Sequence, residues 1–304
     1  MIVLLLPPHS YLSSGGLCYA ECMNQKRTYI IGGLVLLFFT AIALWSEALR
    51  AGSFEVTFFD VGQGDSAFVR TPQGYQIVID GGPDSSVLKK LARKIPFWDK
   101  TIDMVILSHP AQDHVSGLLD VLRRYEVKTI LWTGVEKNTK IFQEWKKAID
   151  REQQEGSAVS FVAGGDSVSL QKGSCPQRID VLSPVESMAG NLVEDDNDTS
   201  LVVQVYSCAH SVLFAGDLTR KGERALLDQD VFLDSDILKV GHHGSKTSSS
   251  QEFIDAVSPN VAVISSGKGN KYGHPAKETL ATLAKYGIEI RRTDEEGDIS
   301  FRFK

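Results

Sequence analysis

From residue 54 onward, short apolar stretches alternate with polar turns, and their periodicity changes along the chain. Alternating apolar and polar positions predict strands, whereas apolar positions three or four apart predict amphipathic helices. The expected strands are FEVTFFDV, SAFVRT, YQIVID, DMVILSH, KTILWTG, SLVVQVYS, SVLFAGD, DILKVGH, VAVISS, IEIRRT and DISFRF, with more between Val159 and Leu182. The expected helices are Ser86–Ile95, Ser116–Tyr125, Lys140–Gln154, a segment after Thr219, Gln251–Val257 and Ala276–Tyr286.

The order of these elements predicts an α+β domain. The early part is rich in antiparallel strands, and the later part alternates strand and helix. SLVVQVYS and SVLFAGD together predict a hairpin. A mixed pair of sheets with helices on both outer faces fits this order. Because no linker-like or low-complexity stretch follows residue 53, we expect one domain over residues 54–304, preceded by an N-terminal segment, residues 1–53.

The N-terminal segment contains nineteen residues without a charge, TYIIGGLVLLFFTAIALWS at positions 28–46. About 20 apolar residues cross a bilayer as a helix. Lys26 and Arg27 precede the run, and by the positive-inside rule they keep that end in the cytoplasm. We therefore expect one hydrophobic helix that anchors an extracytoplasmic domain in the membrane. A cleaved signal, which would make the protein secreted, and a buried core helix remain alternatives.

Two further features concern the start of the chain and its cysteines. MNQKRTYIIGG is a typical opening for an exported protein, so translation starting at Met23 is an alternative to Met1. The four cysteines show no zinc-site spacing. Cys175 and Cys208, the two within residues 54–304, are expected either to pair in an oxidising compartment or to be unlinked buried thiols.

Charge limits how this protein binds a polyanion. The formal net charge is −6, and because residues 1–53 carry +1, residues 54–304 carry about −7. This is not a generally basic surface for nucleic acid. A phosphate substrate must therefore be held locally, by metal ions or by a few lysines and arginines.

Residues able to bind metal recur where the expected strands end and loops begin. Imidazole and carboxylate together suit zinc, manganese or iron. One such residue alone is usually a turn or loop residue, but several clusters at strand ends point to a metal site. The candidates are Asp80, His109, Asp113, His114, Asp217, His242, His243 and His274.

The series DVGQGDS, IDGG, SHPAQDH, NDTSLVV, FAGD, GHHGS and YGHP resembles the metallo-β-lactamase-fold domain of ComEC-type competence proteins, which act in DNA uptake. The resemblance covers about residues 54–304. It implies a four-layer αββα sandwich with the metal site at one edge, between the two sheets. This topology comes from the resemblance and not from the strand pattern.

The resemblance also implies roles for individual residues. Asp217 would bridge two metal ions, and His242 competes with His243 for one ligand position. Asp80 would orient a ligand histidine, and His274 would lie near the substrate, where it polarises a phosphate or a leaving group. The implied metal ligands are His109, Asp113, His114, Asp217 and His243.

One position departs from the wider superfamily. The usual HxHxDH motif has a second histidine where this chain has Ala111. The first metal position is then left with His109 and Asp217 as clear ligands, and the candidates to complete it are Asn197, Asp198 and Ser200. We therefore expect either one or two ions of zinc or manganese.

The implied chemistry is metal-assisted hydrolysis, in which Asp113 holds the attacking water and accepts its proton. Asn197 and Ser200 are candidate substrate contacts. The loop lysines Lys246, Lys268 and Lys271 are candidate phosphate contacts or ordinary solvated surface. The function that we expect is a phosphodiesterase or nuclease acting on single-stranded DNA outside the cytoplasm, with DNA-uptake machinery as a partner. The alternatives are hydrolysis of another small ester, amide or nucleotide, and a non-catalytic metal-binding module, which Ala111 favours.

Overall fold

The computed structural model describes residues 26–41, 52–170 and 176–303. The chain divides into two compact units, residues 1–51 and residues 52–304. The second unit contains every residue predicted above to bind metal or substrate. The two units are therefore described separately.

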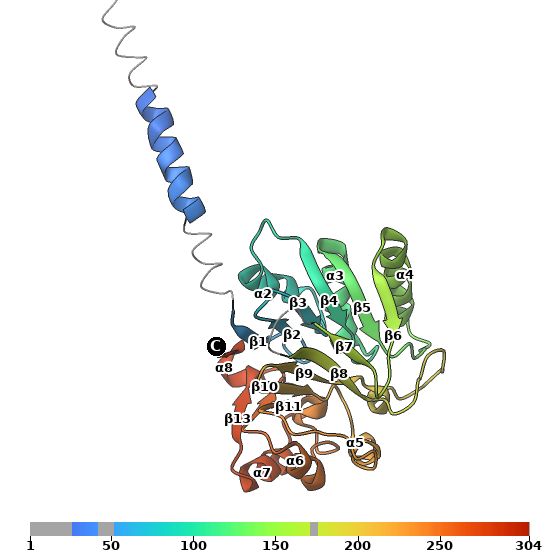
Figure 1. Ribbon diagram of the computed structural model, residues 1–304. Helices are drawn as coiled ribbons and strands as arrows, with labels where there is room; N and C mark the ends of the chain where they lie inside the picture. The colour runs from blue at the N-terminus through green and yellow to red at the C-terminus, as the bar shows by residue number, and fades with distance from the viewer. Residues whose placement is uncertain (1–25, 42–51, 171–175, 304) are drawn as a thin grey trace, which may run out of the picture. The chain divides into compact units, whose positions relative to one another are not determined.

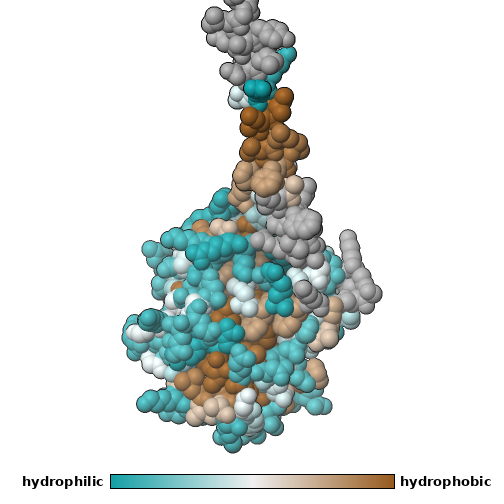
Figure 2. Space-filling view, turned by 90° about the vertical axis from the view of Figure 1, so that its left-hand side faces the viewer, coloured by the Kyte–Doolittle hydropathy of each residue, from teal (hydrophilic) through white to brown (hydrophobic). Residues whose placement is uncertain are grey.

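The described part of the first unit is one helix, residues 26–41. Its first described residues are Lys26 and Arg27. Its large apolar side chains are exposed, and they form the hydrophobic surface of the helix in Figure 2. Among the described residues, no helix is both long and apolar enough to cross a membrane. Residues 42–46 of the expected hydrophobic segment, and Met23, lie outside the described residues.

The second unit contains two seven-stranded sheets (Figure 1). The first sheet has the order β14-β1-β2-β3-β4-β5-β6 and the second the order β13-β12-β11-β10-β9-β8-β7. The strands of the first are β1 (Phe54–Phe58), β2 (Ala67–Arg70), β3 (Gln76–Ile79), β4 (Thr101–Ile106), β5 (Glu126–Trp132), β6 (Ala158–Phe161) and β14 (Ile299–Phe303). Those of the second are β7 (Ser167–Ser169), β8 (Gln177–Ser183), β9 (Val202–Ser207), β10 (His210–Phe214), β11 (Ile237–Lys239), β12 (Val261–Ile264) and β13 (Glu289–Arg292).

Both sheets have the same pattern of strand directions. In the first, β14, β1, β2 and β3 pair antiparallel, and β3 to β6 pair parallel. In the second, β7 to β10 pair antiparallel, and β10 to β13 pair parallel. The expected hairpin is the antiparallel pair β9–β10. The molecule is thus built from two similar halves, although their sequences show no repeat.

Helices cover the outer face of each sheet and complete four layers. The inner faces of the two sheets enclose one hydrophobic core, and two further cores lie under the helices. The αββα sandwich expected from the resemblance is therefore confirmed (Figure 1). The helices on the first sheet are α2 (Ser86–Lys94), α3 (Gln112–Arg124) and α4 (Lys140–Glu155). Those on the second are α5 (Arg220–Leu227), α6 (Gln251–Val257) and α7 (Lys277–Lys285), and the short α8 (Thr293–Glu296) precedes β14.

Helix α3 begins earlier than its sequence predicts. We expected it to start at Ser116, but it starts at Gln112, so Asp113 and His114 lie in its first turn and not in a loop. The residue before the helix, Ala111, makes no side-chain capping bond. Because helix starts are predicted mainly from Ser, Thr, Asp or Asn caps, this start left no signal in the sequence.

Two glycines, one in α3 and one just after β3, allow the backbones of these two elements to pack closely. A Cβ on Gly117 would lie 1.9 Å from the carbonyl oxygen of Gly81, and one on Gly81 would lie 2.3 Å from the amide nitrogen of Leu118. The Gly81 amide also donates to the carbonyl of His114, at 2.7 Å. This backbone contact brings Asp80, the residue before Gly81, next to His114.

Cys208 differs from the unlinked, buried alternative. It is exposed, and it is disulfide-bonded. Cys175 lies outside the described residues.

The glycine contact generates a test of stability. Gly117→Ala should lower the free energy of unfolding by about 3 kcal/mol, because neither backbone can yield to the added methyl group without moving α3 from β3. Urea unfolding of the full chain measures the change. Ser116→Ala, one position away on the same helix, is the control and should change stability by less than about 1 kcal/mol. Equal stability of the two variants would contradict the role given to this contact.

Candidate metal centre

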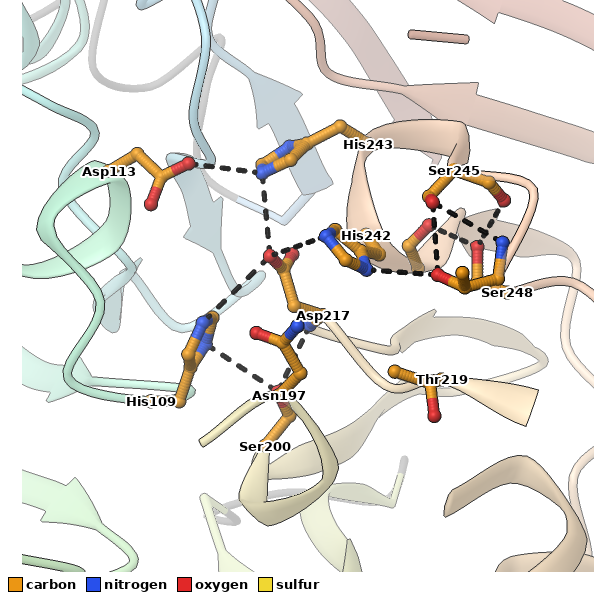
Figure 3. A network of polar contacts seen from close by, with 12 residues as sticks. His109, Asp113, Asn197, Ser200, Asp217, Thr219, His242, His243, Ser245 and Ser248 are labelled. Carbon is orange, nitrogen blue, oxygen red and sulfur yellow. Dashed lines mark hydrogen bonds and ion pairs between the residues drawn. The ribbon is translucent and has the colours of Figure 1, made fainter. Parts of the chain in front are cut away.

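The candidate ligands meet at one edge of the sandwich because they follow the carboxyl ends of neighbouring strands. Asp80 follows β3 directly, and His109 is the third residue after β4. Asp217 follows β10 in the second sheet, and His242 and His243 follow β11 in a short 3-10 turn, η2 (Gly241–Gly244). Residues from both halves of the molecule therefore converge at this edge (Figure 3).

The carboxylate of Asp217 lies at the centre of this cluster. Its Oδ2 is 3.5 Å from Nε2 of His243 and 3.8 Å from Nε2 of His109. Its Oδ1 is 3.3 Å from Nε2 of His114. His242 is farther away, with Nε2 at 4.0 Å from Oδ2, and is partly exposed. Figure 3 shows the carboxylate between the imidazoles of His109, His242 and His243.

The donors fit a metal ion. The Nε2 atoms of His109, His114 and His243 are buried, and none has a hydrogen-bond partner within the described residues. Buried polar atoms without partners are rare in folded proteins, because each costs about 1–3 kcal/mol. His109, His114 and Asp217 form one group close enough to hold an ion, and Asp113, His114 and His243 form another. His243 belongs to the second group and His242 to neither, so His243 is the better candidate for the ligand position that either could fill.

The other ring nitrogens, Nδ1 of His114 and Nδ1 of His243, form hydrogen bonds within the protein. Asp80 Oδ2 is 2.8 Å from Nδ1 of His114 and accepts 2.7 Å from the Ser108 hydroxyl. Nδ1 of His243 donates to the carbonyl of Ser265 at 3.1 Å. A hydrogen bond to Nδ1 leaves Nε2 as the nitrogen that faces an ion and fixes the plane of the ring. The structure thus places Asp80 beside the ligands rather than among the atoms that face the substrate.

Two buried residues in this network were not predicted from the sequence. Asp65 Oδ1 lies 3.1 Å from Nδ1 of His243, and its Oδ2 lies 2.6 Å from Nζ of Lys239. Both had a visible signal. Asp65 stands inside DVGQGDS, and Lys239 is a charge in the otherwise apolar stretch ILKV. Their ion pair links the β1–β2 loop of the first sheet to β11 of the second.

Proximity of the carboxylates controls protonation in this cluster. Burial opposes the charged form of His243, but the carboxylates of Asp217 and Asp65 outweigh it and raise its pKa to about 10. The pKa of His114 is also raised, because Asp217 and Asp80 outweigh its burial. Burial and the nearby charge of His114 lower the pKa of His109. The ion-free cluster therefore carries protons that a metal ion has to displace.

Ala111 lines a hollow together with its neighbours in the chain, Pro110 and Gln112. The hollow has a volume of about 430 Å³ and is also lined by Lys137. The ammonium group of Lys137 forms an ion pair with the buried carboxylate of Asp196. The small side chain at position 111 thus leaves space where the superfamily motif has an imidazole.

The candidates for completing that position differ in exposure. Ser200 is fully buried, and its hydroxyl accepts a hydrogen bond from the Asp217 amide at 3.0 Å. It therefore positions Asp217. It was expected to contact the substrate, and its burial speaks against that contact. Asn197 and Asp198 belong to a 3-10 turn, η1 (Asn197–Thr199), and are partly exposed. The Asp198 carboxylate accepts from the hydroxyl of Thr219 at 2.6 Å.

The remaining predicted substrate residues differ in their surroundings. The His274 ring is 5.7 Å from that of His242 and 6.2 Å from that of His243. Burial and these two imidazoles lower the pKa of His274. Lys246 and Lys268 are exposed side chains, and Lys271 lines a second hollow whose wall includes Asp113.

The comparisons with known proteins agree with this geometry. A model of the metallo-beta-lactamase superfamily matches residues 59–268. ComE operon protein 3 of Bacillus subtilis (strain 168) is 33% identical, over 93% of this chain and 37% of that protein. Competence protein ComA of Neisseria gonorrhoeae is 30% identical, over 88% of this chain and 35% of that protein. The metallo hydrolase Igni18 of Ignicoccus hospitalis shares the fold, with a TM-score of 0.52, 16% identity, and coverage of 83% of this chain and 100% of that one.

Fold and site thus define a metallohydrolase-type sandwich with a histidine and aspartate cluster at its open edge. The chain belongs to the metallo-β-lactamase superfamily, and its similarity to competence proteins is that of a ComEC-type domain. It spans about a third of the length of the curated relatives that it matches.

Ala111 provides a test of how many ions bind. Ala111→His should raise the zinc content, because an imidazole in the adjoining hollow adds a donor to the position served by His109 and Asp217. Elemental analysis after reconstitution measures the stoichiometry. Ala111→Leu fills the same hollow without a donor and should leave the content unchanged. An equal increase in both variants would mean that the effect comes from packing and not from coordination.

Proposed function

We propose that this protein is a metal-dependent phosphodiesterase that cuts DNA outside the cytoplasm and takes part in DNA uptake. The observation that carries the metal dependence is the convergence of three buried, unpartnered imidazole nitrogens on the Asp217 carboxylate. The choice of DNA is supported by the similarity to proteins named for competence. Single-stranded DNA is the first substrate to test.

A bound zinc or manganese ion would lower the pKa of a water ligand and stabilise the charge that builds on a phosphate oxygen. His109, His114, His243 and Asp217 would hold such ions from within the protein. Asp113 differs from them, because its side chain is 34% exposed while those of His243 and Asp217 are 2% and 6% exposed. In this proposal Asp113 is therefore the carboxylate that reaches the attacking water and accepts its proton.

His274 has a different part in this proposal. It lies beside His242 and His243 and is only half-buried. Its lowered pKa keeps the imidazole neutral at pH 7, so it is available to donate a single hydrogen bond to a phosphate oxygen or a leaving group. Because residues 54–304 are acidic overall, DNA binding should depend on few phosphate contacts and weaken steeply with salt.

The alternatives are a hydrolase of another ester, amide or nucleotide, and a module that binds metal without catalysis. The superfamily fold alone does not separate them, since one fold hosts many reactions. Ala111 is the feature that favours the non-catalytic alternative. A substrate panel of single-stranded DNA, bis-p-nitrophenyl phosphate and a β-lactam distinguishes all three.

The phosphodiesterase proposal predicts that the zinc- or manganese-loaded protein cleaves both DNA and bis-p-nitrophenyl phosphate. Asp113→Ala should lower kcat by at least about a hundredfold, because it removes a ligand and the proton acceptor together. Asp120→Ala, on the exposed part of the same helix, is the control and should retain full activity. Asp217→Ala should lose most of the metal. Cleavage of the lactam with both phosphodiesters left intact would refute the proposal.

The location outside the cytoplasm is tested by a reporter fused after Lys304. A reporter that works only outside the cytoplasm should be active in this fusion, because Lys26 and Arg27 keep the N-terminal end of the hydrophobic segment in the cytoplasm. The size of the fused protein then separates an uncleaved anchor from a cleaved signal. Activity of a cytoplasmic reporter at the same position would exclude export.

A further inference from the structure

A second hollow adjoins the metal cluster and shares Gln112 with the hollow beside Ala111. It has a volume of about 390 Å³, and one part of its wall is Asp113, whose Oδ2 is 3.3 Å from Nε2 of His243. A group in this hollow therefore lies beside the reacting centre. Its other lining residues are Gln63, Pro83, Gln112, Asn270, Lys271 and Tyr272.

The lining combines flat surfaces with amide groups. Tyr272 is 59% exposed although it carries a large ring. Its ring stacks against that of His274, with centroids 5.8 Å apart and planes 25° apart. Stacking on an aromatic ring binds any nucleobase and contributes about 1–3 kcal/mol per base. The exposed Gln112 adds an amide of the kind that bonds the edges of bases.

The loop that carries Tyr272 is held in one conformation by its own hydrogen bonds. The Asn270 side chain donates to the carbonyl of His274 at 2.6 Å and accepts from the amides of Tyr272 and His274 at 3.1 and 3.0 Å. The Gly267 amide donates to Gln63 at 3.1 Å, which ties the loop to the β1–β2 loop. A ring fixed in this way loses little conformational entropy when a ligand stacks on it.

Lys271 places a positive charge at the same hollow. Its ammonium group lies 5.2 Å from the centroid of the Tyr272 ring, and the side chain is exposed. The ammonium lies over the ring, and because the lysine side chain is exposed, a stacked base can displace it toward the phosphate that follows the base. The hollow thus offers a flat ring, amides and one cation within reach of the metal ligands.

We propose that this hollow is a nucleobase subsite, in which the base beside the scissile phosphate stacks on Tyr272. The proposal rests on the phosphodiesterase function and extends it. It makes the substrate a nucleotide chain rather than any phosphodiester. Because stacking does not distinguish one base from another, the site selects for the presence of a base and not for a sequence.

The experiment compares two chromogenic diesters that differ only in the group beside the phosphate. One is the p-nitrophenyl ester of thymidine 5′-monophosphate, and the other is methyl p-nitrophenyl phosphate. The wild-type protein should prefer the thymidine ester in kcat/KM. Tyr272→Ala should reduce that preference by at least about fivefold, the equivalent of one stacked base, because the methyl ester has no base to stack. Tyr272→Phe should keep the preference.

Tyr286 is the matched control. It also follows a lysine and precedes a glycine, and the ammonium of Lys285 lies 5.7 Å from its ring centroid. It lies at the end of α7 and is 38% exposed. Tyr286→Ala should therefore leave the preference for thymidine intact. Calorimetric titration with thymidine 5′-monophosphate and with inorganic phosphate gives a readout that does not depend on turnover, and only the former should weaken in Tyr272→Ala.

Each outcome identifies which proposal fails. If Tyr272→Ala lowers kcat/KM for both esters by the same factor, the ring only positions His274, and the base subsite is overturned. An unchanged preference in that variant would overturn it as well. If the metal-loaded wild-type protein cleaves neither ester, the phosphodiesterase function fails instead. Binding of thymidine 5′-monophosphate no tighter than phosphate would remove the subsite even then.

Discussion

Burial of the Asp217 carboxylate is the constraint around which the rest of the site is arranged. Placing a charge between two sheets, away from water, costs several kcal/mol unless opposite charges or donors surround it. Three imidazoles face it here, and the positive charges of His243 and His114 outweigh its burial and lower its pKa well below the usual range. The imidazoles are held in turn by Asp80, Ser108 and Ser265. A divalent ion is the group that satisfies this arrangement without protons, so the cost of burial and the affinity for metal have the same origin.

The two halves of the sandwich share the task of building this centre. The first half supplies His109 from the β4–α3 connection and Asp113 and His114 from the first turn of α3. The second half supplies Asp217 and His243, which follow β10 and β11. The buried pair Asp65–Lys239 joins the halves at the same edge, and Asp65 also contacts His243. The geometry of the centre therefore depends on how the sheets pack, and a change in the interior between them would shift ligands that it does not touch.

Much of this could be predicted from the sequence, because strand periodicity is local and ligand residues stand at strand ends. Every strand named from its pattern is present. The predicted start of α3 was wrong, because Ala111 gives no capping signal. The contact that fixes the helix joins Gly81 and Gly117, which lie 36 positions apart in the sequence. Asp65 was missed because its contact with His243 arises only when loops distant in the sequence meet. Ser200 was misassigned because its burial is a property of the packed sheets and not of its neighbours in the chain.

The pairing of β14 with β1 has a consequence for the order of events during synthesis. Phe54 lies opposite Phe303, so the first strand of the domain completes its ladder only with a strand that follows every ligand in the chain. Contacts between such distant segments form slowly, since a long loop has to close before they contribute. A partly made chain leaves β1 at an unpaired edge of the sheet whose strands β3 and β4 precede Asp80 and His109. The ligand cluster therefore reaches its final packing late, after the last strand of the first sheet has been made.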